Sequence, residues 1–123
     1  MTFFILGHQP SLSLAEIAKV LKKDLSQAQG SEEVLLIPED LPNLPALQSS
    51  LGGTIKVGWT IGEMDRFDEQ ELTDMIVAYI GDAVGKEKIT FGISIYDLGG
   101  EKIYANQMKD IERFGLTVKK MLK

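Results

Sequence analysis

One segment, from Leu51 to Ile61, restricts the fold of this chain more than any other. It opens with the pair Gly52–Gly53, which ends a preceding element, and then alternates between apolar and lighter residues as a β-strand does. The apolar positions of this segment are Ile55, Val57, Trp59 and Ile61. We expect these four side chains to be buried, because such alternation is typical of a sheet that is covered on one face only.

Three further segments predict strands. Between Lys88 and Tyr96, isoleucine and phenylalanine alternate with smaller residues, so this segment repeats the pattern of the first. The apolar runs Thr2–Leu6 and Val34–Ile37 have the length of short strands, and Pro38 closes the second run. The segment from Asp24 to Glu32 is polar and contains a glycine, which predicts a loop.

Two pairs of residues have the spacing of helix N-terminal capping boxes. Ser13 precedes Glu16 by three residues, and apolar residues follow at helical spacing through Leu21. Asp68 precedes Glu71 by the same interval, and the helical pattern behind it runs to about Gly85. The spacing therefore predicts one helix that starts near each pair.

Together these elements predict an α+β domain of the ferredoxin-like βαββαβ type. A short helix that ends at Gly52 is expected as an extra element between the second and third strands, and a further helical stripe begins at Ile111. We assign residues 1–105 to the domain and residues 106–123 to the start of a following segment. The chain stops at Lys123 inside a helical pattern with no terminating residue, so we expect a piece of a longer protein.

The amino-acid composition excludes several classes of protein. The chain has 123 residues and no cysteine, which excludes disulfides, thiolate catalysis and cysteine-ligated metal. It contains no run of about 20 apolar residues that would span a bilayer, and no basic leader followed by a cleavage site. We therefore expect a cytoplasmic protein that does not enter a membrane.

The charge is unevenly distributed along the chain. The net charge of −5 argues against a free-standing nucleic-acid-binding protein, because phosphate contacts need clustered cations. Basic residues nevertheless gather near the C-terminus, and we identify as candidate RNA-binding residues Lys109, Arg113, Lys119, Lys120 and Lys123. The alternative interpretation is the solvated face of a helix.

Other candidate sites have simpler explanations. The acidic residues between Glu63 and Asp74 lack the spacing of a calcium loop, and acids at a helix N-terminus are favourable without a metal, so we expect no metal site. His8 is the only histidine and has no nucleophile or carboxylate partner nearby in sequence. The glycine pairs at 52–53 and 99–100 match no phosphate-binding motif. We therefore assign no catalytic residue.

Three pieces of the sequence resemble one protein family. They are F-F-I-L-G-H-Q-P-S-L-S-L-A-E-I at Phe3–Ile17, L-G-G-T-I-K-V-G at Leu51–Gly58 and F-G-I-S-I-Y at Phe91–Tyr96. The combination is similar to the N-terminal region of THUMP-containing tRNA guanine-N2 methyltransferases, above all the prokaryotic putative RNA methylases. The patterns G-x-x-P-x-L-S-x-A-E and L-G-G-T-[IV]-K carry most of this resemblance.

The resemblance implies a non-catalytic N-terminal domain that helps to position tRNA or another structured RNA. Residues 106–123 would then begin the THUMP region. S-adenosylmethionine would bind a Rossmann-like domain, and the [DN]-P-P-[YF] motif that holds the acceptor nitrogen does not occur in this sequence. A second hypothesis remains open, namely a stand-alone ferredoxin-like interaction module that uses a sheet face or edge, for example to form a homodimer.

Overall fold

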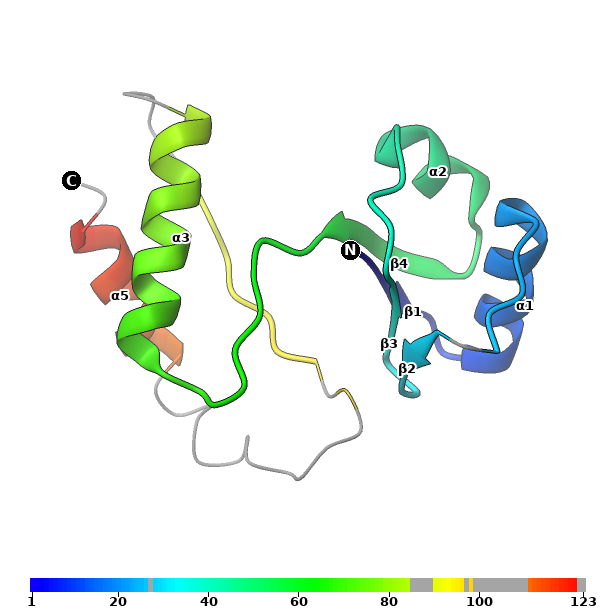
Figure 1. The fold of residues 1–123 in the computed structure, drawn as a ribbon, viewed down its shortest axis with the longest axis horizontal. Helices are drawn as coiled ribbons and strands as arrows, with labels where there is room; N and C mark the ends of the chain where they lie inside the picture. The colour runs from blue at the N-terminus through cyan, green and yellow to red at the C-terminus, as the bar shows by residue number, and fades with distance from the viewer. Residues whose placement is uncertain (27, 85–89, 97, 99–110, 122–123) are drawn as a thin grey trace. The chain divides into compact units, whose positions relative to one another are not determined.

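The computed structural model describes residues 1–26, 28–84, 90–96, 98 and 111–121, and these fall into two compact units. The first unit contains Met1–Thr60 together with Tyr96 and Leu98. The second contains the described residues of Ile61–Ile95 and Lys102–Lys123. Figure 1 shows the helices and strands of both units.

The first unit holds a four-stranded antiparallel sheet with the strand order β2-β3-β1-β4. Its elements in chain order are β1 (Thr2–Leu6), α1 (Pro10–Leu21), β2 (Gln29–Gly30), β3 (Val34–Ile37), α2 (Leu44–Ser50) and β4 (Thr54–Trp59). The first strand is central, with β3 on one side and β4 on the other. This α+β arrangement is compatible with the ferredoxin-like βαββαβ plan, so the predicted fold class is confirmed.

The core of the first unit lies between the sheet and its two helices. Figure 1 shows α1 and α2 on the same side of the strands. Phe4 at the centre of β1 is fully buried, as is Ile17 of α1. Leu35 and Ile37 of β3 belong to the same cluster, and leucines of α2 pack against it. One sheet face is therefore covered by both helices.

The segments that build this plan differ from those expected. Gln29–Gly30 forms β2 inside the expected loop, and α2, expected as an insertion, is the second helix of the plan. The predicted strand at Lys88–Tyr96 is wrong for residues 90–96, which form no strand, while 88 and 89 lie outside the described residues. The last strand of the plan is instead β4, which follows α2 and pairs antiparallel with β1.

The predicted burial along β4 is mostly wrong. This strand ends at Trp59, before Ile61, the last apolar position of the pattern, and the side chain of Ile55 is 57% exposed. A β-bulge explains Ile55: Ile5 pairs with Lys56 but Leu6 pairs with Thr54, so Ile55 has no partner on β1. Thr54 consequently takes the buried position.

The apolar residues further along this segment are also exposed. Trp59 is 50% exposed and Ile61 is 44% exposed, while Val57 is half-buried. The indole N–H of Trp59 donates to the carbonyl oxygen of Leu41 at 2.9 Å, and this hydrogen bond orients the ring. Trp59 is the last residue of β4, an edge strand with a neighbouring strand on one side only, and Ile61 lies beyond the end of that strand.

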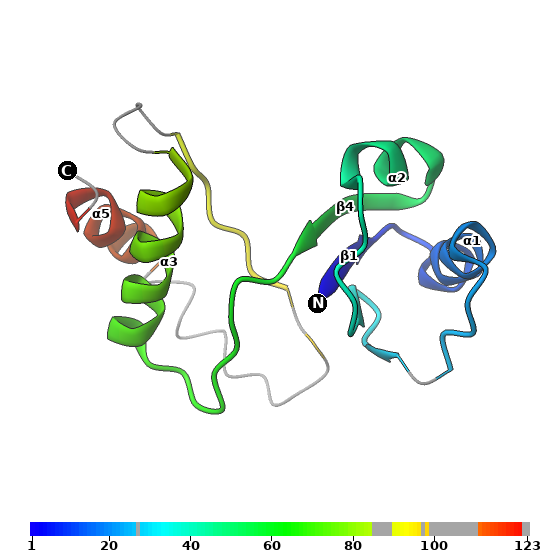
Figure 2. The ribbon, with the colours of Figure 1, turned by 45° about the horizontal axis from the view of Figure 1, so that its top comes forward.

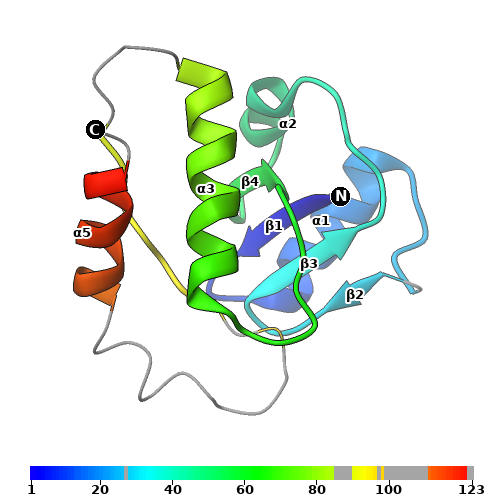
Figure 3. The same ribbon diagram turned by 60° about the vertical axis from the view of Figure 1, so that its left-hand side comes forward.

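The second unit contains two helices, α3 (Glu69–Val84) and α5 (Ile111–Met121). The two helices contact each other, and Figures 2 and 3 show them side by side. Both helices were predicted from their apolar spacing, with bounds within one residue for α3. The predicted boundary between residues 105 and 106 stays a prediction, because residues 99–110 lie outside the described part of the chain.

Candidate functional site

The candidate RNA-binding residues lie in and around α5. Lys119 and Lys120 occupy its last turn and both are exposed. Arg113 belongs to the same helix, two turns before Lys120. Lys109 and Lys123 lie outside the described residues. The structure therefore places two lysines next to each other at one helix end, with Arg113 on the same helix.

Burial differs between neighbouring residues of α5. Val118, which precedes the two lysines, is only 1% exposed, whereas Leu116 is 57% exposed. A Cβ added to Gly115 would lie 3.6 Å from the Cδ1 atom of Ile93, so the backbone of α5 passes close to that side chain. Two cations at the C-terminal end of a helix are also favourable by the helix dipole alone. The lysine pair thus has a structural explanation beside the functional one.

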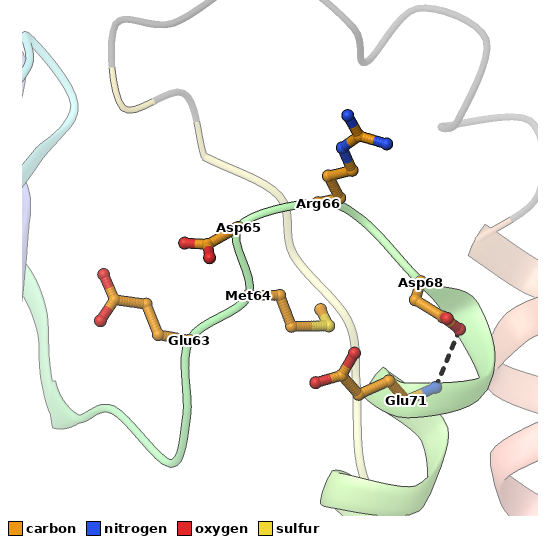
Figure 4. Close-up of a pocket in the computed structure, with 6 residues that line it drawn as sticks. All are labelled: Glu63, Met64, Asp65, Arg66, Asp68 and Glu71. Atoms are coloured by element: carbon orange, nitrogen blue, oxygen red, sulfur yellow. Dashed lines mark hydrogen bonds between the residues drawn. The ribbon is translucent and has the colours of Figure 1, made fainter.

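Four carboxylates, together with Met64 and Arg66, line an open depression of about 740 Å³ before α3 (Figure 4). The Asp68 carboxylate caps the helix, because its Oδ1 atom accepts hydrogen bonds from the N–H groups of Gln70 and Glu71 at 2.9 and 3.1 Å. Glu63 and Asp65 point away from Asp68 in Figure 4. Among the described residues, no group of three or more histidine, aspartate or glutamate side chains could hold a metal ion.

Two of the sequence pieces that carry the family resemblance meet at one point of the first unit. The backbone N–H of Gly7 donates to Ser13 Oγ at 3.3 Å, and the Ser13 hydroxyl donates to the carbonyl oxygen of Gly53 at 3.0 Å. Glu16 completes the contact, since its Oε1 atom accepts from the Gly53 N–H at 3.0 Å. We call this set of four residues, Gly7, Ser13, Glu16 and Gly53, the helix–turn lock.

Sequence reasoning missed the helix–turn lock. It treated Ser13 and Glu16 as a capping box, but the residue before the helix is Gln9, and no side chain caps α1. The available signal was Pro10, because proline is favoured at the first position of a helix and would have placed Ser13 inside it. The predicted capping box at Ser13 is therefore wrong, whereas Asp68 is confirmed as the N-terminal cap of α3.

The helix–turn lock also argues against a phosphate-binding loop at Gly52–Gly53. A phosphate-binding loop directs free backbone N–H groups at an anion, but the N–H of Gly53 is already bonded to a carboxylate of the same chain. An added Cβ at Gly7 would overlap the carbonyl oxygen of Gly53, so glycine is required where the two segments cross. The pair at 99–100 lies outside the described residues.

A small pocket of about 290 Å³ adjoins the helix–turn lock and is lined in part by His8, Gln9 and Leu12. His8 is exposed at its edge. The only hydroxyl in the lining is that of Ser13, and its proton is committed to the Gly53 carbonyl. The pocket therefore presents no nucleophile with a free base beside it, and we assign it no catalysis.

No helix among the described residues has the length and apolar character needed to cross a membrane. No protein-family model, no curated protein and no solved structure matches this chain. The resemblance to RNA methyltransferases, the tRNA partner and the cytoplasmic location therefore stay predictions.

Proposed function

We propose that this chain is a non-catalytic RNA-binding domain of an S-adenosylmethionine-dependent tRNA guanine-N2 methyltransferase. The observation that supports this most directly is the pair of exposed lysines, Lys119 and Lys120, in the last turn of α5. Phosphate contacts by lysine position a protein on RNA without reading its sequence. Such contacts suit a domain that orients the RNA while another part of the protein performs the reaction.

The packing of α5 is compatible with this role. The helix contacts α3, and the buried Val118 lies directly before the lysine pair. The lysines are thus carried by a packed helix rather than by an isolated one. In the family that the sequence resembles, methyl transfer and S-adenosylmethionine belong to a Rossmann-like domain whose [DN]-P-P-[YF] motif does not occur here.

The proposal is tested with the double variant Lys119→Glu/Lys120→Glu and unmodified tRNA as the probe. Loss of two phosphate contacts should weaken binding about 10-fold or more at low salt and reduce the slope of log K against log salt by about 1 to 2. The matched control is Lys19→Glu/Lys22→Glu, which makes the same charge change at two exposed lysines, Lys19 in the last turn of α1 and Lys22 directly after the helix. Equal losses in both variants, or none in either, would reject α5 as the RNA-binding element.

A second candidate is the stand-alone interaction or dimerisation module. It is favoured by β4, which lies at the edge of the sheet and carries the exposed side chains of Ile55 and Trp59. Exposed edge strands can pair with a strand of a second copy. Sedimentation of the wild type and of Trp59→Lys over a range of concentrations distinguishes the two, since a dimer formed through β4 should dissociate in the variant.

A further inference from the structure

The sheet has a second face, which α1 and α2 do not cover. Side chains alternate along β1, so Phe3 and Ile5 point away from the helices that cover Phe4. Phe3 pairs with Leu36 of β3 and with Gly58 of β4, and these three residues form one row across the sheet. Ile5 of the next row is buried, so the accessible part of this face centres on the row that contains Phe3.

The ring of Phe3 lies over Gly58. An added Cβ at Gly58 would be 2.5 Å from Cζ of Phe3, which means that the ring fills the space that a side chain would otherwise occupy. Because Gly58 has no side chain, the ring can lie along the sheet instead of standing upright on it. Phe3 remains half-buried, so part of the ring is reachable from solvent.

A cation and a second aromatic ring lie on the same face. Lys56 pairs with Ile5 and is exposed, and its ammonium nitrogen is 5.9 Å from the centroid of the Tyr96 ring. Tyr96 is half-buried. Lys56 is also the single charged residue in the four strands, so the sheet itself carries positive charge in a chain of net charge −5.

We propose that this face, formed by Phe3, Gly58, Lys56 and Tyr96, binds single-stranded RNA. Bases would stack on the two aromatic rings, and Lys56 would pair with a phosphate between them. Aromatic side chains on an open four-stranded sheet recognise unpaired bases in this way, and a nearby cation holds the backbone. The inference rests on the proposed RNA-binding function and adds that the sheet takes an unpaired segment, whereas α5 contacts phosphates of structured RNA.

The test measures binding of a fluorescein-labelled oligouridylate by fluorescence anisotropy. Phe3→Leu and Tyr96→Leu should each weaken binding about 5- to 100-fold, because each removes a stacking surface. Phe3→Tyr keeps the ring and should bind like the wild type, which separates stacking from a packing defect. The matched control is Phe67→Leu, which removes an exposed ring from the second unit and should change nothing. Lys56→Gln should lower the salt slope by about 0.7, the value for one phosphate contact to a single strand.

The outcomes separate this inference from the proposed function. Oligouridylate binding that survives Lys119→Glu/Lys120→Glu but falls in Phe3→Leu supports the sheet site, whatever happens to tRNA binding. Failure of the wild type to bind oligouridylate at low salt overturns it, even if α5 is shown to bind tRNA. Equal binding by Phe3→Leu, Phe3→Tyr and Phe67→Leu also overturns it, and a dimer that occludes this face would do the same.

Discussion

Two pairs of residues with the same spacing make different hydrogen bonds in this molecule. They are Ser13 with Glu16, and Asp68 with Glu71. Asp68 stands just before α3 and accepts two N–H groups of its first turn. Ser13 lies in the second turn of α1, and both Ser13 and Glu16 bond to the turn at Gly53, some 40 residues away in sequence. The Asp68 carboxylate thus acts within one helix, whereas Ser13 and Glu16 join two parts of the fold.

The difference follows from where each helix begins. Pro10 starts α1 three residues before Ser13, so the serine is already inside the helix and its 2% exposed side chain faces the protein. No such residue precedes Asp68, which is therefore free to take the capping position. A capping pattern therefore predicts a cap only when the helix does not already begin at an earlier residue, as α1 does at Pro10.

The largest effect on stability should come from Gly7→Ala, which disrupts the helix–turn lock. The added Cβ would overlap the Gly53 carbonyl oxygen, a backbone atom, and we expect a loss of about 3 kcal/mol in the free energy of unfolding. Urea unfolding followed by the fluorescence of Trp59, the only tryptophan, reports on the same unit. The control is Gly81→Ala in α3 of the second unit, where an added Cβ meets nothing within 4 Å and alanine favours the helix, so the Trp59 unfolding curve should show no loss of stability.

Ser13→Ala should cost about 2 kcal/mol, because it leaves the Gly7 N–H and the Gly53 carbonyl oxygen without their partner. The same Trp59 unfolding curve measures this loss. If Ser13 were a cap after all, the effect would be confined to the first turn of α1. Unchanged urea stability with faster exchange of those first-turn amides would therefore contradict the helix–turn lock.

Asp68→Ala should cost about 1 kcal/mol of α3 stability, the usual contribution of an N-terminal cap. The readout is amide hydrogen exchange at Gln70 and Glu71, whose N–H groups lose their acceptor. Asp68→Asn keeps an acceptor oxygen and should restore most of the protection. Equal exchange in the alanine variant and the wild type would show that Asp68 is not a cap in solution.

The smallest effect concerns another side chain that bonds to backbone, Asp24. The Ser26 backbone N–H, and after it the Ser26 hydroxyl, lower the pKa of Asp24 below its ordinary value of 3.8. A lowered pKa in the folded state means that Asp24 stabilises the fold above that value and loses this contribution as the pH falls through its folded pKa. Asp24→Asn should therefore reduce stability slightly at neutral pH and not in strong acid, as urea unfolding at both pH values would show.

Most elements of the fold could be predicted from local pattern. The strands Thr2–Leu6 and Val34–Ile37 agree with the structure residue for residue, and α3 agrees within one residue at each end. These segments carry their own periodicity, so their type does not depend on distant partners. The two-residue strand β2 could not be found in this way, because Gln29 and Gly30 form a strand only by pairing with β3.

The sites were less predictable than the fold. Lys119 and Lys120 were identified by charge alone, and their exposure agrees with either a binding role or a solvated face. The prediction that Ile55 is buried was wrong because of the β-bulge. A bulge depends on the register with β1, which the alternation of residues in the sequence does not specify. The rings of Phe3 and Tyr96 were not considered as a site, since one was assigned to a core strand and the other ended a predicted strand.

The position of β1 has a consequence for how the chain is made. Among the four strands of the sheet β1 is synthesised before the others, yet one of its two neighbours, β4, begins only at Thr54. At a translation rate of 5–20 residues per second, roughly 2 to 10 seconds pass between the synthesis of β1 and that of β4. During that interval a strongly apolar strand, T-F-F-I-L, is open on one side, and a nascent chain in this state is a natural target for chaperones.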